Sequence, residues 1–400
     1  MTHIDTEKKY IILGIESSCD ETAAAVVTGD GVNPPVILSN IVSSQVDLHA
    51  KTGGIVPEVA SRAHMEAIVP VVAEALLQAG FSDHPDIQGA INSLHHKISH
   101  IAVTSGPGLI GSLLVGFNAA KSLAYACDLP IVPIHHIEGH IYSAAAEEIQ
   151  NPKSKIQSKD PTAQNRKEQN KQGTIHDTCY LLREISFPAL ALVVSGGHTS
   201  LILMRDHGKY EIIGQTLDDA AGEAFDKVAK LLGIGYPGGP AVSKLAGKYR
   251  TSQAAARNAV SFPRPLLNDG TFNFSFSGLK TAVLREVREK SHLSADLKAS
   301  IAAAFEDAAV DVLVAKTMKA VQKYEPITII LAGGVAANTH LRHSLANAVN
   351  SLEIKPDLYV PPIHLCGDNA AMIALAGYYH AVKGDVKSWN QVTIDSNMAL

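Results

Sequence analysis

The sequence predicts an α/β protein built from two similar lobes with a central cleft between them. A pattern of strand, polar turn and strand occurs at 10–27 and again at 189–204. A second pattern of strand, Gly-rich turn and helix occurs at 100–126 and again at 327–348. Because the two patterns follow one another in the same order in each half, they indicate an internal duplication.

The first pattern predicts one β-hairpin in each half. Apolar runs at Tyr10–Ile15 and Ala23–Val27 flank the polar turn ESSCDET. Apolar runs at Ala189–Val194 and Leu201–Met204 flank the turn SGGHTS in the same way. Two short apolar runs around a tight polar turn are typical of a hairpin.

The second pattern predicts a strand that enters a helix through glycines. His100–Thr104 precedes SGPGLIGS and the helical spacing of Leu113–Ala126. Ile327–Leu331 precedes AGGVAANTHL and a helix that continues through Ala348. Such a turn at a helix N-terminus is suited to bind phosphate. The sequence has no P-loop motif, so a nucleotide is expected between the two hairpins, as in the actin, Hsp70 and sugar-kinase fold.

The predicted lobes occupy 1–146 and 187–400, and the last helix is a candidate to pack back on the N-terminal lobe. Between them, 147–186 is expected to be an insertion. Its part 147–178 is rich in Lys, Gln, Asn and Ser, which favours a solvated surface segment over a docking segment for an anionic partner. A smaller insertion is expected at His84–His100.

Composition excludes several classes of protein. Of the 400 residues, 46% are hydrophobic and 18% charged, which excludes a disordered chain, and no apolar run is long enough to cross a bilayer. The net charge of −5 argues against non-specific coating of nucleic acid. The four cysteines form no C-x-x-C pair, and the N-terminus lacks the pattern of a signal peptide. We expect a cytoplasmic protein.

A pair of histidines has the spacing of metal ligands. His136 and His140 in HIEGH lie about 40° apart on a helix, with roughly 6 Å between them. Glu138 falls about 200° from His136, which disfavours the metallopeptidase arrangement H-E-x-x-H. Because the chain has eighteen histidines, a pair at this spacing also arises by chance.

Asp368 is a candidate third ligand. It stands at the start of the apolar helix predicted from GDNAAMIALA, where it is equally suited to cap the helix. Two histidines and one carboxylate suit iron or zinc in a catalytic role. Both interpretations of Asp368 stay open at this point.

Residues 216–233 predict an amphipathic helix with a carboxylate stripe. Asp219, Glu223 and Asp226 share one face of it, which suits either hydrogen bonds to a ligand's hydroxyl groups or a solvated surface. The following turn Gly235–Pro240 allows the backbone to approach a ligand or a packed loop closely.

Several long motifs together resemble one family. The chain is similar to the bacterial-type tRNA N6-adenosine threonylcarbamoyltransferases, formerly described as O-sialoglycoprotein endopeptidases, over nearly its whole length except the two insertions and the C-terminal tail. The motifs that carry this resemblance are GIESSCDETAAAVV, GGIVPEVASRAHMEAI, SGPGLIGSLLVG, HHIEGH, VVSGGHTSL, LDDAAGEAFDKVAKLLGIGYPGGP, FSFSGLKTAV, LAGGVAANTHLR and GDNAAMIA.

The resemblance implies a set of site residues. It implies that His136, His140 and Asp368 bind one divalent metal, with Fe(2+) expected first and Zn(2+) second. We add the hypothesis that Asp20 or Glu21 accepts a proton in the reaction. The substrate-binding residues that the resemblance implies are Val193, Val194, Ser195, Gly196, Gly197, Asp226, Gly239 and Asn338.

The resemblance also implies a reaction and partners. The L-threonylcarbamoyl group would move from threonylcarbamoyl-AMP to N6 of adenosine 37 in tRNAs that read ANN codons. A smaller paralogue of the same fold and a P-loop ATPase would assist, and no membrane is involved. The 147–178 insertion and the C-terminal sequence VTIDSNMAL depart from the family pattern. The alternatives are a nucleotide-binding scaffold, a sugar or acetate kinase of the same fold, and the disfavoured metallopeptidase.

Overall fold

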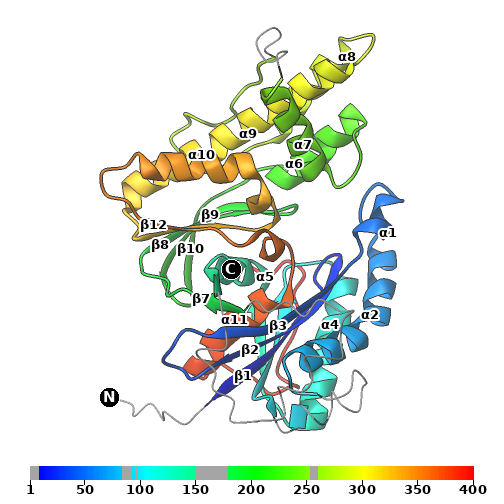
Figure 1. Cartoon of the computed structure of the whole chain (residues 1–400), viewed down its shortest axis with the longest axis vertical. Helices are drawn as coiled ribbons and strands as arrows, with labels where there is room; N and C mark the ends of the chain where they lie inside the picture. The colour runs from blue at the N-terminus through cyan, green and yellow to red at the C-terminus, as the bar shows by residue number, and fades with distance from the viewer. Residues whose placement is uncertain (1–8, 83–91, 93, 96, 150–178, 253–259) are drawn as a thin grey trace, which may run out of the picture.

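The computed structural model describes residues 9–82, 92, 94–95, 97–149, 179–252 and 260–400. Most of the predicted insertion 147–178 lies outside the described residues. The molecule consists of two β-sheets stacked one above the other, with helices on the outer faces and between them (Figure 1).

The first sheet has seven strands in the order β5-β4-β1-β2-β3-β7-β6. Strands β1, β2 and β3 are antiparallel neighbours, whereas β4 pairs with β1 in parallel and β5 pairs with β4 in parallel. The strands are β1 (Tyr10–Glu16), β2 (Glu21–Gly29), β3 (Val36–Ser44), β4 (His100–Gly106), β5 (Ile131–His135), β6 (Ala146–Ile149) and β7 (Cys179–Leu182).

The second sheet repeats the same design in five strands, in the order β10-β9-β8-β11-β12. Its antiparallel part, β8 to β10, corresponds to β1 to β3, and its parallel strands β11 and β12 correspond to β4 and β5. This strand-for-strand match confirms the predicted duplication. The strands are β8 (Ala189–Val194), β9 (Thr199–Asp206), β10 (Lys209–Gln215), β11 (Thr328–Ala332) and β12 (Asp357–Tyr359).

The helices cover both sheets. Those of the N-terminal half are α1 (Val46–Ala50), α2 (Pro57–Gln78), α4 (Ile110–Cys127) and α5 (His136–Ser143). Those of the C-terminal half are α6 (Ala221–Leu232), α7 (Gly238–Arg250), α8 (Ser277–Arg288), α9 (Ala295–Tyr324), α10 (Thr339–Asn350) and α11 (Ala370–Lys383), with short 3-10 turns η4 (Gly334–Ala337) and η5 (Ile363–Leu365). Figure 1 shows α6 to α10 above the second sheet, and α2 and α4 on the outer face of the first.

Side-chain alternation along the strands builds three apolar cores. Val194 of β8 points into the outer core of the second sheet, against α6, α9 and α10, whereas its neighbour Val193 points into a core between the two sheets. That central core also holds Ile12 of β1 and most of α5 and α11. The third core lies between the first sheet and the helices α2 and α4. The two lobes therefore share one buried centre.

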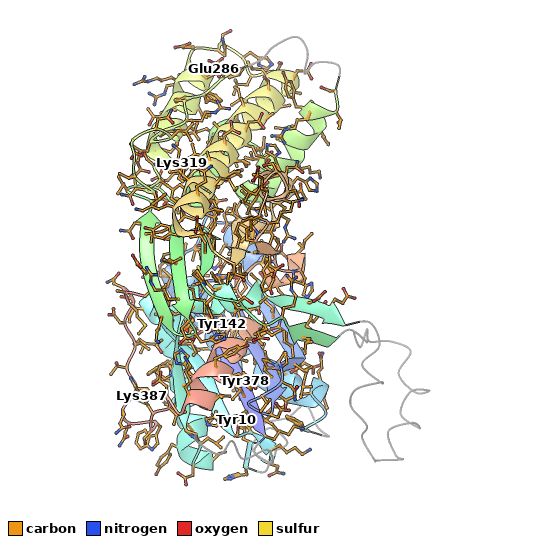
Figure 2. All side chains as sticks on the ribbon, turned by 90° about the vertical axis from the view of Figure 1, so that its left-hand side faces the viewer. Tyr10, Tyr142, Glu286, Lys319, Tyr378 and Lys387 are labelled. Atoms are coloured by element: carbon orange, nitrogen blue, oxygen red, sulfur yellow. The ribbon has the colours of Figure 1, made fainter. Side chains whose placement is uncertain are left out.

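Helix α11 comes from the C-terminal half but packs on β1, β2 and β4 of the first sheet. Small residues permit this close approach, because a Cβ at Gly14 of β1 would lie 2.8 Å from Ala374 Cβ. The rings of Tyr10 and Tyr378 meet edge to face at 6.0 Å where the same two elements continue (Figure 2). The chain then returns along the first sheet, where Lys387 forms an isolated antiparallel β-bridge with Ile131 of β5.

One predicted helix begins later than expected. The spacing predicts a helix over 216–233, but α6 begins at Ala221, after a loop in which Thr216 Oγ1 donates to the Asp219 carbonyl (2.8 Å). Asp219 therefore lies outside the helix, and Leu217 is 63% exposed instead of packing on the apolar side. Among the helices that the structure describes, none combines the length and apolar character of a membrane span.

We expect Gly377→Ala to lower the free energy of unfolding by roughly 1–3 kcal/mol, because overpacking forces a tight interface apart. The added Cβ would lie 2.4 Å from Ala102 Cβ, where α11 crosses β4. Urea unfolding followed by circular dichroism measures the change. The matched control is Gly247→Ala in α7, whose Cβ would meet nothing within 4 Å and should leave stability unchanged or slightly raised. An equal loss in both variants would contradict the close packing of α11.

Candidate active site

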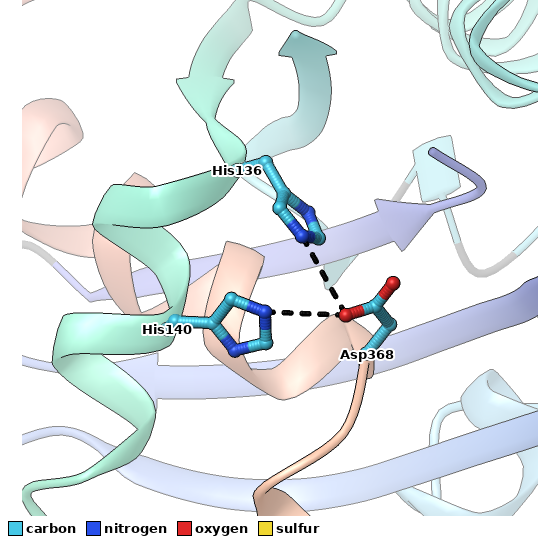
Figure 3. Close-up of side chains that lie close together, drawn as sticks. All are labelled: His136, His140 and Asp368. Carbon is cyan, nitrogen blue, oxygen red and sulfur yellow. Dashed lines mark ion pairs between the residues drawn. The ribbon is translucent and has the colours of Figure 1, made fainter. Parts of the chain in front are cut away.

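The short helix α5 carries both predicted metal histidines. Its eight residues are all buried, and its cap is His135, whose Nδ1 accepts from Ile137 N–H (3.1 Å). The other nitrogen of His135, Nε2, donates to the carbonyl of Met398 (3.1 Å), so the C-terminal segment fixes the start of the helix. His136 and His140 then face the same direction one turn apart (Figure 3).

Asp368 completes a group of three. Its Oδ1 lies 3.5 Å from His136 Nε2 and 3.2 Å from His140 Nε2, as the dashed lines in Figure 3 mark. The capping role that competed with this assignment belongs to the next residue, since Asn369 Oδ1 accepts from Met372 N–H (3.1 Å) at the start of α11. The carboxylate of Asp368 is thus free of the helix cap and can serve as a ligand.

The donor set fits a divalent metal. His140 is buried, and neither of its ring nitrogens has a hydrogen-bond partner among the residues that the structure describes, although Nε2 points at Asp368. The ring centroids of His136 and His140 lie 4.7 Å apart and nearly perpendicular. An ion between the three residues would satisfy Nε2 of His140, and two imidazoles with one carboxylate suit iron or zinc.

A buried carboxylate orients the first ligand. Glu16 at the end of β1 lies with Oε2 3.3 Å from His136 Nδ1, and Ser18 Oγ is 3.1 Å from the same nitrogen. Thr104 Oγ1 donates to Glu16 (2.6 Å), which holds the carboxylate in place. Such partners commonly fix the ring and tautomer of a metal-bound histidine, and they leave Nε2 for the metal.

Opposite charges shift the pKa values of the ligands. Burial disfavours the charged form of His136, but Asp368 and Glu16 outweigh it and raise the pKa of His136 to about 9. Burial would raise the pKa of Asp368, but His136 and His140 outweigh it and lower that pKa to about 2. The three side chains therefore attract one another even without an ion.

Glu138 lies on the opposite side of α5 from the histidines. It accepts hydrogen bonds from Tyr210 Oη (2.6 Å) of β10 and from His380 Nε2 (3.0 Å) of α11. The helical spacing predicted this direction correctly. Because Glu138 is buried among these partners, it ties α5 to the second sheet and does not reach the metal ligands.

The turn of the first hairpin brings further acids to the site. Ligand atoms of Cys19, Asp20 and Asp368 lie within 4.8 Å of one another. Burial, Asp368 and a hydrogen bond with Asp20 raise the pKa of Glu21 to about 10, so Glu21 holds a proton at neutral pH. Of the two carboxyl groups that were predicted as proton acceptors, Asp20 is therefore the one grouped with the metal ligands.

The second hairpin turn approaches the metal ligands from the other lobe. Ser195 Oγ accepts from His198 N–H (3.1 Å), which closes the SGGH turn. Burial, with the nearby His136, His135 and His140, lowers the pKa of His198 to about 4, so its ring is neutral. The motif SGGHTS contained this histidine, but its spacing gave no reason to assign it to the metal group.

A cavity of about 570 Å³ opens beside this turn in the second lobe. Four of the predicted substrate-binding residues line it: Gly196, Asp226, Gly239 and Asn338. Asp226 Oδ1 accepts from Gly238 N–H (2.7 Å), which joins α6 to the start of α7. The side chains of Val193 and Val194 are instead buried in the two cores.

A buried acid holds the far wall of the cavity. Asn338 caps α10 through Oδ1, which accepts from Leu341 N–H (2.9 Å), and its Nδ2 donates to Glu306 (2.7 Å). Glu306 is 1% exposed and also accepts from Arg250 (2.6 Å) and Ser243 (2.6 Å). The sequence analysis missed Glu306, because a lone glutamate inside a long helix carries no signal of its own.

The two Gly-rich turns differ in what they face. In the first lobe, Leu109 N–H donates to the carbonyl of Ser18 (2.8 Å), and a Cβ at Gly108 would lie 2.7 Å from the same oxygen. The first hairpin turn therefore fills this site. In the second lobe, Gly334 and its neighbours line the 570 Å³ cavity, so this turn borders open space that a ligand can enter.

Comparisons with known proteins point to one enzyme family. A family model described as tRNA N6-adenosine threonylcarbamoyltransferase matches residues 36–156 and 172–375. A relative of that name from Bacillus subtilis is 44% identical over 379 residues, which cover 94% of this chain and 92% of the relative. One from Symbiobacterium thermophilum is 47% identical and covers 92% and 91% respectively.

A solved structure shows the same fold at low identity. Full-length HypF in a phosphate- and nucleotide-bound form superimposes with a TM-score of 0.51 and 14% sequence identity. The match covers 95% of this chain and 47% of HypF. At this identity the likeness concerns the fold alone.

We expect His140→Ala and Asp368→Ala each to abolish stoichiometric metal binding, because each removes one of three ligands. Glu16→Gln should weaken binding by about 10–100-fold, since it alters only the partner of His136. Anaerobic loading with iron(II), followed by plasma mass spectrometry of the washed protein, measures the content. His343→Ala on the exposed face of α10 is the control and should bind like the wild type. Full metal content in His140→Ala would rule out this site.

Proposed function

The chain belongs to the tRNA N6-adenosine threonylcarbamoyltransferase family, and on this basis we propose that it moves an L-threonylcarbamoyl group from threonylcarbamoyl-AMP to N6 of adenosine 37 in tRNAs that read ANN codons. One observation supports the details most. The turn from Ser195 to His198 lines the 570 Å³ cavity through Gly196, and its His198 lies near enough to His136 and His140 for them to help lower its pKa. A donor in the cavity would thus present its reactive end to the metal group.

The donor is an activated acyl compound, which the reaction requires because an exocyclic adenine amine is a weak nucleophile. The N6 lone pair attacks the carbamoyl carbon, a C–N bond forms, and the C–O bond to the phosphate breaks. The electron pair leaves with AMP, and the amine gives up one proton. The AMP part would lie against Gly196 and Gly239, with Asp226 placed to accept from its ribose hydroxyls and Asn338 at the far wall.

His136, His140 and Asp368 would hold the divalent metal, for which we propose iron, with zinc as the alternative. When bound there, the ion supplies Lewis acidity that polarises the threonylcarbamoyl group. The backbone of residues 193–197 would fix the position of the donor relative to the three metal ligands, because the side chains of Val193 and Val194 are anchored in the cores. Asp20, the carboxylate next to Asp368, would take the proton from the amine.

The other functions that the sequence left open are less well supported. A metallopeptidase of the H-E-x-x-H type takes its base from the metal-binding helix, but the glutamate of this helix, Glu138, is engaged by Tyr210 and His380 behind α5. A nucleotide-binding scaffold or a kinase would use the second-lobe cavity, yet it would have no use for the group of His136, His140 and Asp368.

Accessory proteins would act with this chain in the cytoplasm. With a net charge of −5, the chain needs help to hold an RNA, and a same-fold paralogue and a P-loop ATPase are the partners we propose. The outer helices of the first lobe offer the paralogue a surface, because Met65 and Val69 of α2 are 61% and 47% exposed. Ile110 and Leu114 of the adjacent α4 are exposed in the same way. Apolar side chains exposed together mark interaction sites.

The transfer itself is tested with the chain, its accessory proteins, threonylcarbamoyl-AMP and an unmodified ANN-decoding tRNA, with the digested nucleosides read by mass spectrometry. We expect the wild type to form N6-threonylcarbamoyladenosine and His140→Ala to form none. In single turnover, Asp20→Asn should slow transfer by about a hundredfold, because it removes the proton acceptor. Glu21→Gln should stay near the wild-type rate, because Glu21 already carries a proton. Wild-type rates in Asp20→Asn would remove Asp20 from the mechanism.

We expect Met65→Asp to weaken binding of the same-fold paralogue by about tenfold or more, because it places a charge in an apolar interface. Isothermal titration calorimetry with the purified paralogue measures the affinity. The control is Ile354→Asp, an apolar residue on the other lobe that is even more exposed (90% against 61% for Met65), and this variant should bind normally. If both variants bind like the wild type, the paralogue docks elsewhere.

A further inference from the structure

A second cavity, of about 540 Å³, lies between the lobes and is not used by the donor site described above. Ala50 of α1 and the loop Gly53–Ile55 form its wall in the first lobe. Lys227 and Lys230 of α6 and the turn that ends at Tyr236 form its wall in the second lobe. Figure 1 shows α1 at the end of the first lobe that is directed toward α6 and α7.

The two cavities meet at one side chain. Asp226 lines both of them, so a ligand in one cavity and a ligand in the other would touch the same carboxylate. Burial, together with the nearby Asp20 and Asp226, raises the pKa of Tyr236 to about 12. A group that enters the second cavity reaches the shared Asp226 from the side of the first-lobe wall.

The walls of this cavity are flat and partly aromatic. A Cβ added at Gly53, Gly54 or Gly235 would meet nothing within 4 Å, so these backbone faces border open space. Tyr236 is half-buried and lines the same cavity. An extended backbone surface and a tyrosine ring suit a planar heterocycle, which stacks on aromatic side chains.

The two lysines of the cavity differ in their charge partners. Lys227 donates to Asp219 (2.8 Å) and contacts Glu223 (2.7 Å), so two carboxylates neutralise it. Lys230, one turn further along α6, is exposed and forms no ion pair with any residue that the structure describes. Its ammonium group is available at the mouth of the cavity for an anion that comes from solvent.

We propose that this second cavity receives the acceptor nucleotide of the RNA, with its adenine against Tyr236 and the glycine faces, and a neighbouring phosphate at Lys230. The inference rests on the proposed transfer function and names the acceptor's side of that site. The amine must reach the carbamoyl carbon from a direction that the leaving AMP does not occupy. Two cavities that share Asp226 provide two such directions.

Steady-state transfer with varied tRNA concentration tests this assignment in the complete enzyme with its accessory proteins. We expect Lys230→Glu to raise the KM for tRNA about tenfold and to leave kcat unchanged. The slope of log KM against the logarithm of the salt concentration should fall by about one, because one phosphate contact is lost. Tyr236→Ala should lower kcat/KM on the order of tenfold, and Tyr236→Phe should restore it, because the ring is what stacks. Binding of AMP, measured by calorimetry, should be unchanged in all three variants.

Lys248→Glu on α7 is the matched control, because it is an exposed lysine of the same lobe outside both cavities and should leave the KM unchanged. Equal KM values for Lys230→Glu and Lys248→Glu would overturn the acceptor site. In that case, normal turnover by the wild type would still support the transfer function. Loss of AMP binding in Tyr236→Ala would assign the cavity to the donor and likewise overturn the proposal. Absence of product from the wild type would reject the transfer function itself.

Discussion

The structure depends on a pair of helices buried between two sheets. Helices α5 and α11 fill the central core, and they also carry or directly follow the residues that make the metal group. His136 and His140 lie on α5, whereas Asp368 stands just before α11. Because both helices are packed on all sides, the ligands cannot drift apart without opening the core. Glu138 reinforces this arrangement from the back of α5 by accepting hydrogen bonds from a strand of the second sheet and from α11. Apolar packing thus sets the geometry of the three side chains that could hold an ion.

The duplication supplies two equivalent scaffolds, but the molecule uses them differently. In the first lobe the turn after β4 is closed by the hairpin turn, since Ser17 Oγ donates to the carbonyl of Ser112 (2.8 Å) and accepts from Gly116 N–H (3.0 Å). This contact positions Glu16 and Asp20 at the metal group. In the second lobe the equivalent turn is left open and borders a cavity. One hairpin therefore lies at the group of His136, His140 and Asp368, and the other borders the open cavity, which explains why two copies of one design differ in their surroundings.

Local patterns in the sequence predicted the parts of the structure that depend on neighbours along the chain. The four hairpin strands, the helical spacing of His136 and His140 and the outward direction of Glu138 all follow from periodicity. Periodicity could not decide between Asp368 and Asn369 as the cap of α11, because adjacent residues of both types are equally suited to that role. It also placed Asp219 on a helix that starts two residues later, since a loop with favourable hydrogen bonds competed with the first turn. Glu16 and Glu306 were missed, because their partners come from distant segments that only the folded chain brings together.

The way α11 crosses from one half to the other has a consequence for how the protein is made. A ribosome releases the first lobe's strands long before residues 370–383, which cover the inner face of its sheet. Until then, the grooves at Gly14 and Gly29 that receive α11 stay open to water, as do the apolar side chains around them. The N-terminal half therefore cannot complete its fold until α11 has been synthesised, and until then it exposes an apolar surface that chaperones would recognise. A nascent chain that stalls after the second sheet but before α11 is exposed to aggregation and proteolysis.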